Sequence, residues 1–517
     1  IKPAAGTSPV ISGAAASNPL IKINGGSNVV IDGSNSVGGT TRDLILTNTS
    51  ATSPNVVVIG SPDSTPVTNV ILKNTVLTNG ANTSSAVVVS SSATIGNAGY
   101  FNNITIQNNS VNKAYVGIYV IGNTATNNGN GLLIDGNTLN SSGANSIRLI
   151  GIYVQGVDGN SVISNNTVGN ISNSNSESVT GIWLATAANK AAVYGNNISG
   201  VASTVSGSYT AGGIYVSSGS TVSAINIYNN NISNISSLGS YVDGSTGIEI
   251  GGATANVNIY SNKISNIKNT NTSGYGAAGI FLGSSATVAN TASYNNMIWD
   301  VAGYGSATLT RNGHGIYLYS GGGYKLYYNS VNLTTNQTTG ISAALYIYSS
   351  VSTASSVDMR NNIFANSQTS NTRYAIYSTS AKTIFSNIDY NDYYSAGTLG
   401  YLVSAQSTLA AWQTATGSDV NSLNVLPPFV SATDLHLSGS SCTPIESAGT
   451  PISGISTDID NDSRSSSNPD LGADEFNGNA LPKITSVTGG SNCGTGTVQL
   501  TANGSTLGSA ITEYRWY

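Results

Sequence analysis

Three aspartates near the C-terminal end, Asp458, Asp460 and Asp462, alternate with other residues and could ligate a metal ion. Ca²⁺ takes oxygen ligands from alternate positions of a loop, so this spacing is compatible with calcium. A complete loop of that kind would also need Gly after Asp462 and Glu at the twelfth position, where this chain has Ser463 and Pro469. The sequence leaves two hypotheses, a structural calcium site or a solvated cap with Asp–Arg pairs, and predicts no other cofactor.

Paired carboxylates for sugar chemistry are the second candidate. Glycoside hydrolysis needs two carboxyl groups that face each other across roughly 5–10 Å. The central part of the chain offers acidic residues at differing positions within its repeats: Asp135, Asp158, Glu177, Asp243, Glu249, Asp300 and Asp358. No two neighbouring repeats supply a pair at the same register, and a calcium-binding carboxylate cluster for a lyase is missing too. The sequence therefore predicts no catalytic residue and a protein that is not an enzyme.

His314 lies in the motif Asn312-Gly313-His314-Gly315, and the other histidine, His436, has no neighbours that suggest a triad. Gly315 is the glycine of a repeated motif, so His314 occupies the variable position before it. We expect His314 to be structural.

Aromatic residues recur in two columns. If the aliphatic residues of the repeated motif face inward, strand alternation places the central residue outward. The first column is Tyr119, Tyr153, Trp183, Tyr215, Phe281, Tyr317, Tyr346 and Tyr377, and the second is Tyr194, Tyr228, Tyr260, Tyr294 and Tyr327. The first column could bind an extended glycan. The alternative, which the regular spacing favours, is that the rings stack to stabilise the sheet, at about 0.2–1 kcal/mol per pair.

The element that must position these side chains is a repeat. An Asn followed two residues later by an aliphatic residue recurs every 28–35 residues, at Asn74, Asn109, Asn137, Asn166, Asn196, Asn230, Asn262, Asn296, Asn329 and Asn361. A second motif, from Gly117-Ile118-Tyr119-Val120 to Ala375-Ile376-Tyr377-Ser378, keeps the same period. Short alternating apolar runs separated by Gly, Asn and Ser indicate strands and turns. The sequence predicts an all-β, right-handed parallel β-helix of about 13 coils over residues 1–400.

The repeated Asn has a physical explanation in such a solenoid. It would lie at a turn, where Asn tolerates a left-handed backbone. Its amide could donate to and accept from the same amide in adjacent coils, which forms a ladder. Unpaired, each buried polar group would cost about 1–3 kcal/mol. The Ser/Asn/Gly/Thr-rich insertions at 170–179, 201–211 and 269–277 are expected to project as loops on one side.

The end of the solenoid needs a cover, because an open sheet edge invites pairing with other chains. The repeat weakens after residue 385, and residues 408–415 suggest a short helix. Residues 401–480 are therefore predicted to hold the last coils and a capping segment.

Composition narrows the function further. Charged residues make up 8% of the chain and the net charge is −5, with no basic block, so we expect no nucleic-acid partner. No run of 18 apolar residues exists, and a membrane-spanning protein is not expected. The two cysteines, Cys442 and Cys493, give neither a zinc motif nor a disulfide framework.

Three stretches resemble secreted β-helix repeat proteins of Bacteroidota. They are residues 21–50, the segment 434–476 with Asp458-Ile459-Asp460-Asn461-Asp462-Ser463-Arg464 and Pro469-Asp470-Leu471-Gly472-Ala473-Asp474-Glu475-Phe476, and residues 482–517. The last stretch is similar to the start of an Ig-like module, so 481–517 would be an incomplete β-sandwich. The resemblance implies an extracellular or bacterial cell-surface location, with export by the type IX route through a C-terminal domain missing here.

These observations lead to a functional hypothesis and two alternatives. The hypothesis is a non-enzymatic, adhesin-like rod of a larger surface or secreted protein that binds a glycan or another cell-surface ligand. One alternative is a carbohydrate-active β-helix enzyme, a polysaccharide lyase or hydrolase. A Gly-His-Gly like that around His314 occurs in polygalacturonase-like hydrolases, but their Asn-Thr-Asp and Asp-Asp partners are absent. The other alternative is a structural fibre component that self-associates.

Overall fold

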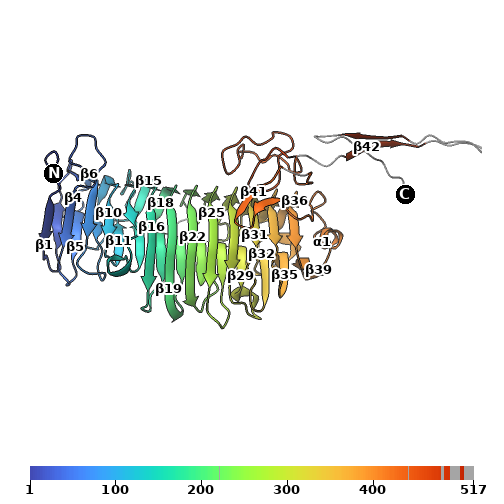
Figure 1. Cartoon of the computed structure of the whole chain (residues 1–517), viewed down its shortest axis with the longest axis horizontal. Helices are drawn as coiled ribbons and strands as arrows, with labels where there is room; N and C mark the ends of the chain where they lie inside the picture. The colour runs from blue at the N-terminus through green and yellow to red at the C-terminus, as the bar shows by residue number, and fades with distance from the viewer. Residues whose placement is uncertain (220–221, 440–441, 479–482, 490–500, 506–517) are drawn as a thin grey trace, which may run out of the picture.

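The short apolar runs form strands that stack coil on coil into a long rod, shown in the computed structural model (Figure 1). The structure describes residues 1–219, 222–439, 442–478, 483–489 and 501–505. Each coil contributes one strand to each of three sheets, here called A, B and C in the order in which the chain enters them. Twelve coils are complete and a thirteenth ends after its second strand. The fold is the predicted parallel β-solenoid.

Sheet A has 13 parallel strands. They are β1 (Val10–Gly13), β4 (Leu44–Asn48), β7 (Thr75–Thr78), β10 (Ser110–Asn112), β13 (Thr138–Leu139), β16 (Thr167–Asn173), β19 (Asn197–Gly207), β22 (Asn231–Gly239), β25 (Lys263–Asn269), β28 (Met297–Ala302), β31 (Ser330–Leu333), β34 (Ile363–Asn366) and β37 (Asp392–Ser395).

Sheet B has 14 strands, of which the last is antiparallel to its neighbour. They are β2 (Pro19–Asn24), β5 (Asn55–Ser61), β8 (Val87–Ser91), β11 (Val116–Ile121), β14 (Ile150–Gln155), β17 (Val179–Leu184), β20 (Ala211–Val216), β23 (Ser245–Ile250), β26 (Ala277–Leu282), β29 (Gly313–Leu318), β32 (Ile341–Ile347), β35 (Thr372–Ser378), β38 (Thr398–Leu402) and β39 (Ser404–Gln406).

Sheet C has 12 parallel strands. They are β3 (Val30–Asp32), β6 (Val67–Lys73), β9 (Phe101–Gln107), β12 (Leu133–Asp135), β15 (Val157–Ser164), β18 (Ala188–Tyr194), β21 (Ile225–Tyr228), β24 (Val257–Tyr260), β27 (Ala292–Tyr294), β30 (Tyr324–Tyr327), β33 (Val357–Arg360) and β36 (Phe385–Asp389). Short 3₁₀ turns occur at Gly143–Asn145, Leu309–Arg311 and Lys382–Ile384.

The repeated glycine of sheet B is required by close packing inside the rod. A Cβ atom on Gly181 would lie 2.6 Å from the Ile198 side chain of sheet A and 2.7 Å from the carbonyl oxygen of Gly213. The next residue of the motif is buried in every coil, as Ile182 and Ile214 show. The inner aliphatic residues of all three sheets form one continuous core along the rod.

The asparagine ladder is present at the turn from sheet C to sheet A. Asn166 shows the pattern: its backbone N–H and its side-chain Nδ2 both donate to Oδ1 of Asn196, each at 3.0 Å, and Nδ2 also donates to the carbonyl oxygen of Ile134. Asn137 makes the same bonds to Asn166. Every amide is thereby satisfied, although all are buried. The ladder runs through Asn109, Asn137, Asn166, Asn196, Asn230, Asn262, Asn296 and Asn329.

Two predicted members of the ladder, Asn74 and Asn361, lie one residue before it. Thr75 occupies the ladder position in its coil and donates to Asn109, whereas Asn362 receives the bond from Asn329. Asn74 and Asn361 are turn residues with φ of 58° and 62°. From Asn74 to Tyr390 the left-handed backbone belongs to this preceding position in each coil, as in Asn165 with φ of 53°, and not to the ladder Asn itself. The sequence motif did not distinguish the ladder position from the turn position that precedes it.

The ladder also extends further than the sequence indicated. Asn362 donates to Asn391 of the next coil, and the backbone N–H of Asn391 donates to Ser422. The motif was missed there because aromatic residues, Phe364 and Tyr393, take the place of the inward aliphatic residue.

Helix α1 (Leu409–Thr416), which agrees with the helix expected near residues 408–415, covers the C-terminal end of the rod. Its Trp412 is fully buried against the last coil, and the indole N–H donates to Asp419 at 2.6 Å. Tyr393 of β37 donates to the same carboxylate at 2.8 Å. No helix in the described part of the chain combines the length and apolarity needed to cross a membrane.

Residues 434–439 and 442–476, here called the fold-back segment, lie along the flank of the rod and not across its end (Figure 1). Its strand β41 (Asp434–Leu437) pairs with β40 (Phe429–Ser431). The segment bonds to turns between sheets C and A: Asn295 donates to the Thr457 carbonyl at 2.8 Å, and Tyr328 donates to that of Thr450 at 2.9 Å.

Hydrogen bonds to acidic and basic side chains hold the irregular backbone of the fold-back segment. Asp458 is buried, and its carboxylate accepts from the backbone N–H groups of Asp460, Asp462 and Glu475. Arg464 is buried over the Tyr328 ring and donates to Asn295 and Glu475. These bonds satisfy backbone groups of an irregular chain and tie it to the rod.

The predicted Ig-like region lies mostly outside the described residues. Strands β42 (Lys483–Thr488) and β43 (Thr501–Ser505) pair in an antiparallel arrangement. Cys493 and residues 514–517, on which that prediction depended, are not among the described residues.

Candidate functional site

The first aromatic column is one row of rings on the outer face of sheet B. Tyr119, Tyr153, Trp183 and Tyr215 are paired in register from coil to coil and are half-buried. Their ring centroids lie 5.0, 5.3 and 5.3 Å apart. Next in register comes Glu249, which interrupts the row. This half of the column is a line of partly exposed aromatic rings in contact with one another.

The other half of the column is covered. Phe281, Tyr317, Tyr346 and Tyr377 continue the register beyond Glu249, but Tyr317 and Tyr346 are only 0% and 1% exposed. They form a small second core with Val242 and Leu309 from the loops between sheets A and B, and with Ile341 at the start of β32. Of the eight predicted glycan-binding residues, these four are therefore enclosed by the protein itself.

The second column lies on the outer face of sheet C. Tyr194, Tyr228, Tyr260 and Tyr294 stack with centroids 4.8 Å apart and ring planes within 14° of parallel. Tyr327 differs, because its hydroxyl donates to Asp358 at 2.8 Å. The Tyr294 ring also packs near Ile452 and Ile455 of the fold-back segment. Stacking within the sheet accounts for the contacts of these rings.

A carboxyl pair lies where the exposed and covered halves of the first column meet. Glu249 points outward from β23, and Asp243 reaches it from the loop that precedes this strand. Thr246 donates to Glu249 at 3.2 Å, whereas Oδ1 of Asp243 is buried without a hydrogen bond. Burial raises the pKa of Asp243 to about 6. Burial and the neighbouring Asp243 raise the pKa of Glu249 well above its ordinary range.

Sequence reasoning missed this pair because it compared acidic residues only at equal positions of neighbouring coils. Asp243 belongs to an insertion between sheets A and B of the same coil, and the insertion brings it back over the strand. A signal was available: Glu249 is the single acidic residue at the aromatic position, and an acidic residue stands six positions before it.

His314 lies beneath the covered half of the column. It is fully buried between Tyr317 and Tyr346. Its Nδ1 accepts from the Ala343 backbone N–H at 3.2 Å, and its Nε2 lies 3.0 Å from the Leu309 carbonyl oxygen, to which it donates. Burial lowers the pKa of His314 to about 4, so the ring is neutral at pH 7. Both nitrogens are committed to the backbone, and the ring holds the covering loop in place.

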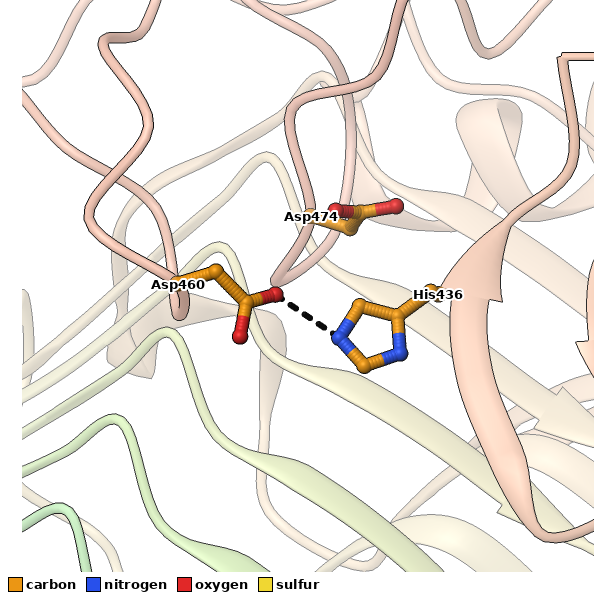
Figure 2. Close-up of side chains that lie close together, drawn as sticks. All are labelled: His436, Asp460 and Asp474. Carbon is orange, nitrogen blue, oxygen red and sulfur yellow. Dashed lines mark hydrogen bonds and ion pairs between the residues drawn. The ribbon is translucent and has the colours of Figure 1, made fainter.

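The predicted calcium ligands do not converge. Asp458 is used by backbone N–H groups, Asp462 is exposed, and Asp460 turns toward His436 instead. In the described residues, ligand atoms of His436, Asp460 and Asp474 lie within 4.8 Å of one another (Figure 2).

These features define the class of the protein, a parallel β-solenoid with an asparagine ladder, an outer aromatic row and a fold-back segment. The chain matches no protein-family model and no curated protein. The resemblance to secreted Bacteroidota proteins therefore stays a prediction.

Proposed function

We propose that this protein is a non-enzymatic, extracellular adhesive rod that binds an extended glycan along sheet B. The observation that supports this most is the row of Tyr119, Tyr153, Trp183 and Tyr215, whose half-buried rings follow one another at 5.0–5.3 Å. A rigid solenoid presents such a row with a small ordering cost on binding. The composition, poor in charged residues, and the resemblance of the fold-back segment support a place outside the cell.

The chemistry of this row suits sugars. Aromatic rings offer an apolar face with a polar edge, which matches the apolar faces and hydroxyl rims of pyranose rings. Polar groups also fix the rings: Trp183 donates to Ser217 at 2.9 Å, and the Tyr153 hydroxyl donates to Gln155 at 2.5 Å. Preorganised rings lose little side-chain entropy when a ligand stacks on them.

A glycan array probed with the whole chain tests the proposal, followed by titration of any polysaccharide that binds. We expect Trp183→Ala to weaken binding at least tenfold, because it removes the largest face of the row. Tyr260→Ala, a half-buried ring on sheet C, is the matched control and should leave binding unchanged. Equal affinity in both variants, or no binding on the array, would contradict the proposal.

The carboxyl pair favours the enzyme as a second candidate. Asp243 and Glu249 adjoin the aromatic row, and at least one of them can hold a proton at neutral pH. A carboxylic acid held protonated can serve as a general acid. A turnover assay on neutral and acidic polysaccharides separates the two candidates. Product release that Glu249→Gln abolishes would replace the adhesive rod with a glycan-cleaving enzyme.

A further inference from the structure

His436 of β41 lies between acidic side chains from different parts of the fold-back segment. Its Nδ1 contacts the Asp434 carboxylate two residues away, and its Nε2 lies 2.7 Å from Oδ2 of Asp460. Asp474 completes the group from a third stretch of chain (Figure 2). Lys263 of sheet A pairs with this group, with its Nζ 3.8 Å from Oδ1 of Asp460.

One ring nitrogen of His436 is turned toward carboxylates from two other stretches of the chain. If Nδ1 carries the proton that it gives to Asp434, then Nε2 presents a lone pair. Nε2 faces Oδ2 of Asp460 at 2.7 Å, a contact that a proton on the ring bridges, and a metal ion bound to both atoms would take the place of that proton. A ring held at one nitrogen by a carboxylate, with the other nitrogen free, is the usual arrangement of a metal-binding histidine.

Asp474 gives independent support, because it is only 8% exposed. One of its oxygens, Oδ2, accepts from the backbone N–H of Leu437 at 2.6 Å. Its other oxygen takes part in no hydrogen bond among the described residues, although the carboxylate lies beside His436 (Figure 2). A carboxylate oxygen that no protein donor occupies, beside an imidazole nitrogen, is available as a metal ligand.

We propose that His436 Nε2, Asp460 and Asp474 bind a divalent transition-metal ion of the zinc type, with Asp434 as a positioning residue. Imidazole together with carboxylates suits Zn²⁺, whereas Ca²⁺ prefers oxygen ligands alone. Bonds of about 2.0–2.2 Å in a tetrahedral site would separate the ligand atoms by roughly 3.3–3.6 Å. Nε2 and Oδ2 of Asp460 must therefore move apart by less than about 1 Å, which the exposed Asp460 side chain permits.

The ion would fasten three stretches of an irregular segment to one another. Asp460 also pairs with Lys263, so the site would lie directly against the rod. Cross-linking these stretches stabilises the folded segment by mass action, because the unfolded chain does not bring the three ligands together.

Calorimetric titration of the whole chain with ZnCl₂ at pH 7.5, after dialysis against chelator, tests the proposal. We expect one ion per chain and a rise in melting temperature with zinc. His436→Ala should weaken binding at least tenfold. Asp460→Asn, on an exposed side chain that the fold does not need, should weaken it as well. Asp462→Asn, exposed in the same loop, is the matched control and should bind zinc as the parent does.

Three outcomes would overturn the proposal. One is the absence of zinc binding by the parent chain, and another is an unchanged affinity in Asp460→Asn. The third is that a proton, and not a metal ion, bridges these side chains. In that case the melting temperature depends on pH, His436→Ala abolishes this dependence, and zinc has no effect. Calcium binding without zinc binding counts as the first of these outcomes.

Discussion

The ladder asparagine is the residue on which each coil depends. Its Oδ1 accepts two hydrogen bonds from the preceding coil, and its Nδ2 donates to the following amide and to a backbone carbonyl, as in Asn166 and Asn196. A side-chain amide carries an acceptor oxygen and two N–H donors, so it can accept from one coil and donate to the next, and the same pattern can repeat in every coil. Where the pattern starts, Thr75 can donate through its hydroxyl but adds no second donor.

Replacement of one ladder residue should destabilise the protein. Asn196→Ala removes the acceptor for two donors of Asn166 and the donor to the Ile163 carbonyl. We expect a loss of about 1–3 kcal/mol for each buried group left unpaired, measured by denaturant unfolding. Asn197→Ala, the exposed neighbour, is the control and should change stability little. Equal losses in both variants would show that the ladder bonds add nothing to stability.

At the scale of elements, the loop before β23 is joined to the sheet by the carboxyl pair of Asp243 and Glu249. Both acids have pKa values raised in the folded state, so the folded loop binds more protons than the unfolded chain once pH exceeds about 4. Stability must then fall as pH rises through about 6, because the slope follows the difference in bound protons. The pair therefore holds the loop more firmly in acid than in alkali.

Thermal unfolding from pH 4 to pH 8 tests this loop contact. We expect the parent chain to lose stability, as pH rises, relative to Glu249→Gln, whose neutral amide can donate to Asp243 at every pH. Glu177→Gln is the control. Glu177 lies in a corresponding loop but forms a salt bridge with Arg148 instead of a carboxyl pair, so this variant should keep the pH slope of the parent. Parallel pH profiles for the parent and Glu249→Gln would rule out a contribution of this carboxyl pair to the pH dependence.

The fold-back segment illustrates another use of side chains at this scale. Its described residues hold one short strand, β41, and several of its backbone N–H groups donate to Asp458, Asp470 and Glu475 instead, while Arg464 links it to the rod. Among the alternating aspartates, Asp458 thus accepts the backbone hydrogen bonds that a helix or sheet would otherwise form. Of the three alternating aspartates, Asp460 is the one that contacts His436.

At the scale of the whole molecule, the rod is a stack in which each coil contacts mainly its neighbours, so its ends decide whether it stays apart from other copies. Helix α1 closes one end. Trp412 fills the space above Gly400, and its indole N–H is bound by Asp419.

Trp412→Ala should therefore change the association of the protein as well as its stability. Removing a buried Trp costs about 3–5 kcal/mol, and loosening α1 uncovers the edge of the last coil. We expect concentration-dependent oligomers by light scattering. Trp183→Ala removes the same side chain from the outer face without uncovering an edge and should leave the protein at the oligomeric state of the parent. A Trp412→Ala protein that matches the control would show that α1 is not the barrier to association.

The sequence by itself determined the solenoid, the register of sheet B and the position of the closing helix. These follow from local rules: strand alternation, a small residue where two sheets approach, and an amide repeated once per coil. The same rules placed the ladder correctly from Asn109 to Asn329. At both ends they chose the neighbouring turn residue, because Asn favours the left-handed turn and the ladder alike.

Only the tertiary structure decided what surrounds the outward side chains. Loops of variable length cover Tyr317 and Tyr346 but leave Tyr153 and Trp183 half-exposed, and one loop brings Asp243 onto Glu249. The fold-back of residues 434–476 likewise brings His436 to Asp460 and Asp474. Periodicity describes a residue's position within its coil, whereas these contacts depend on the path of irregular chain, which no repeat specifies.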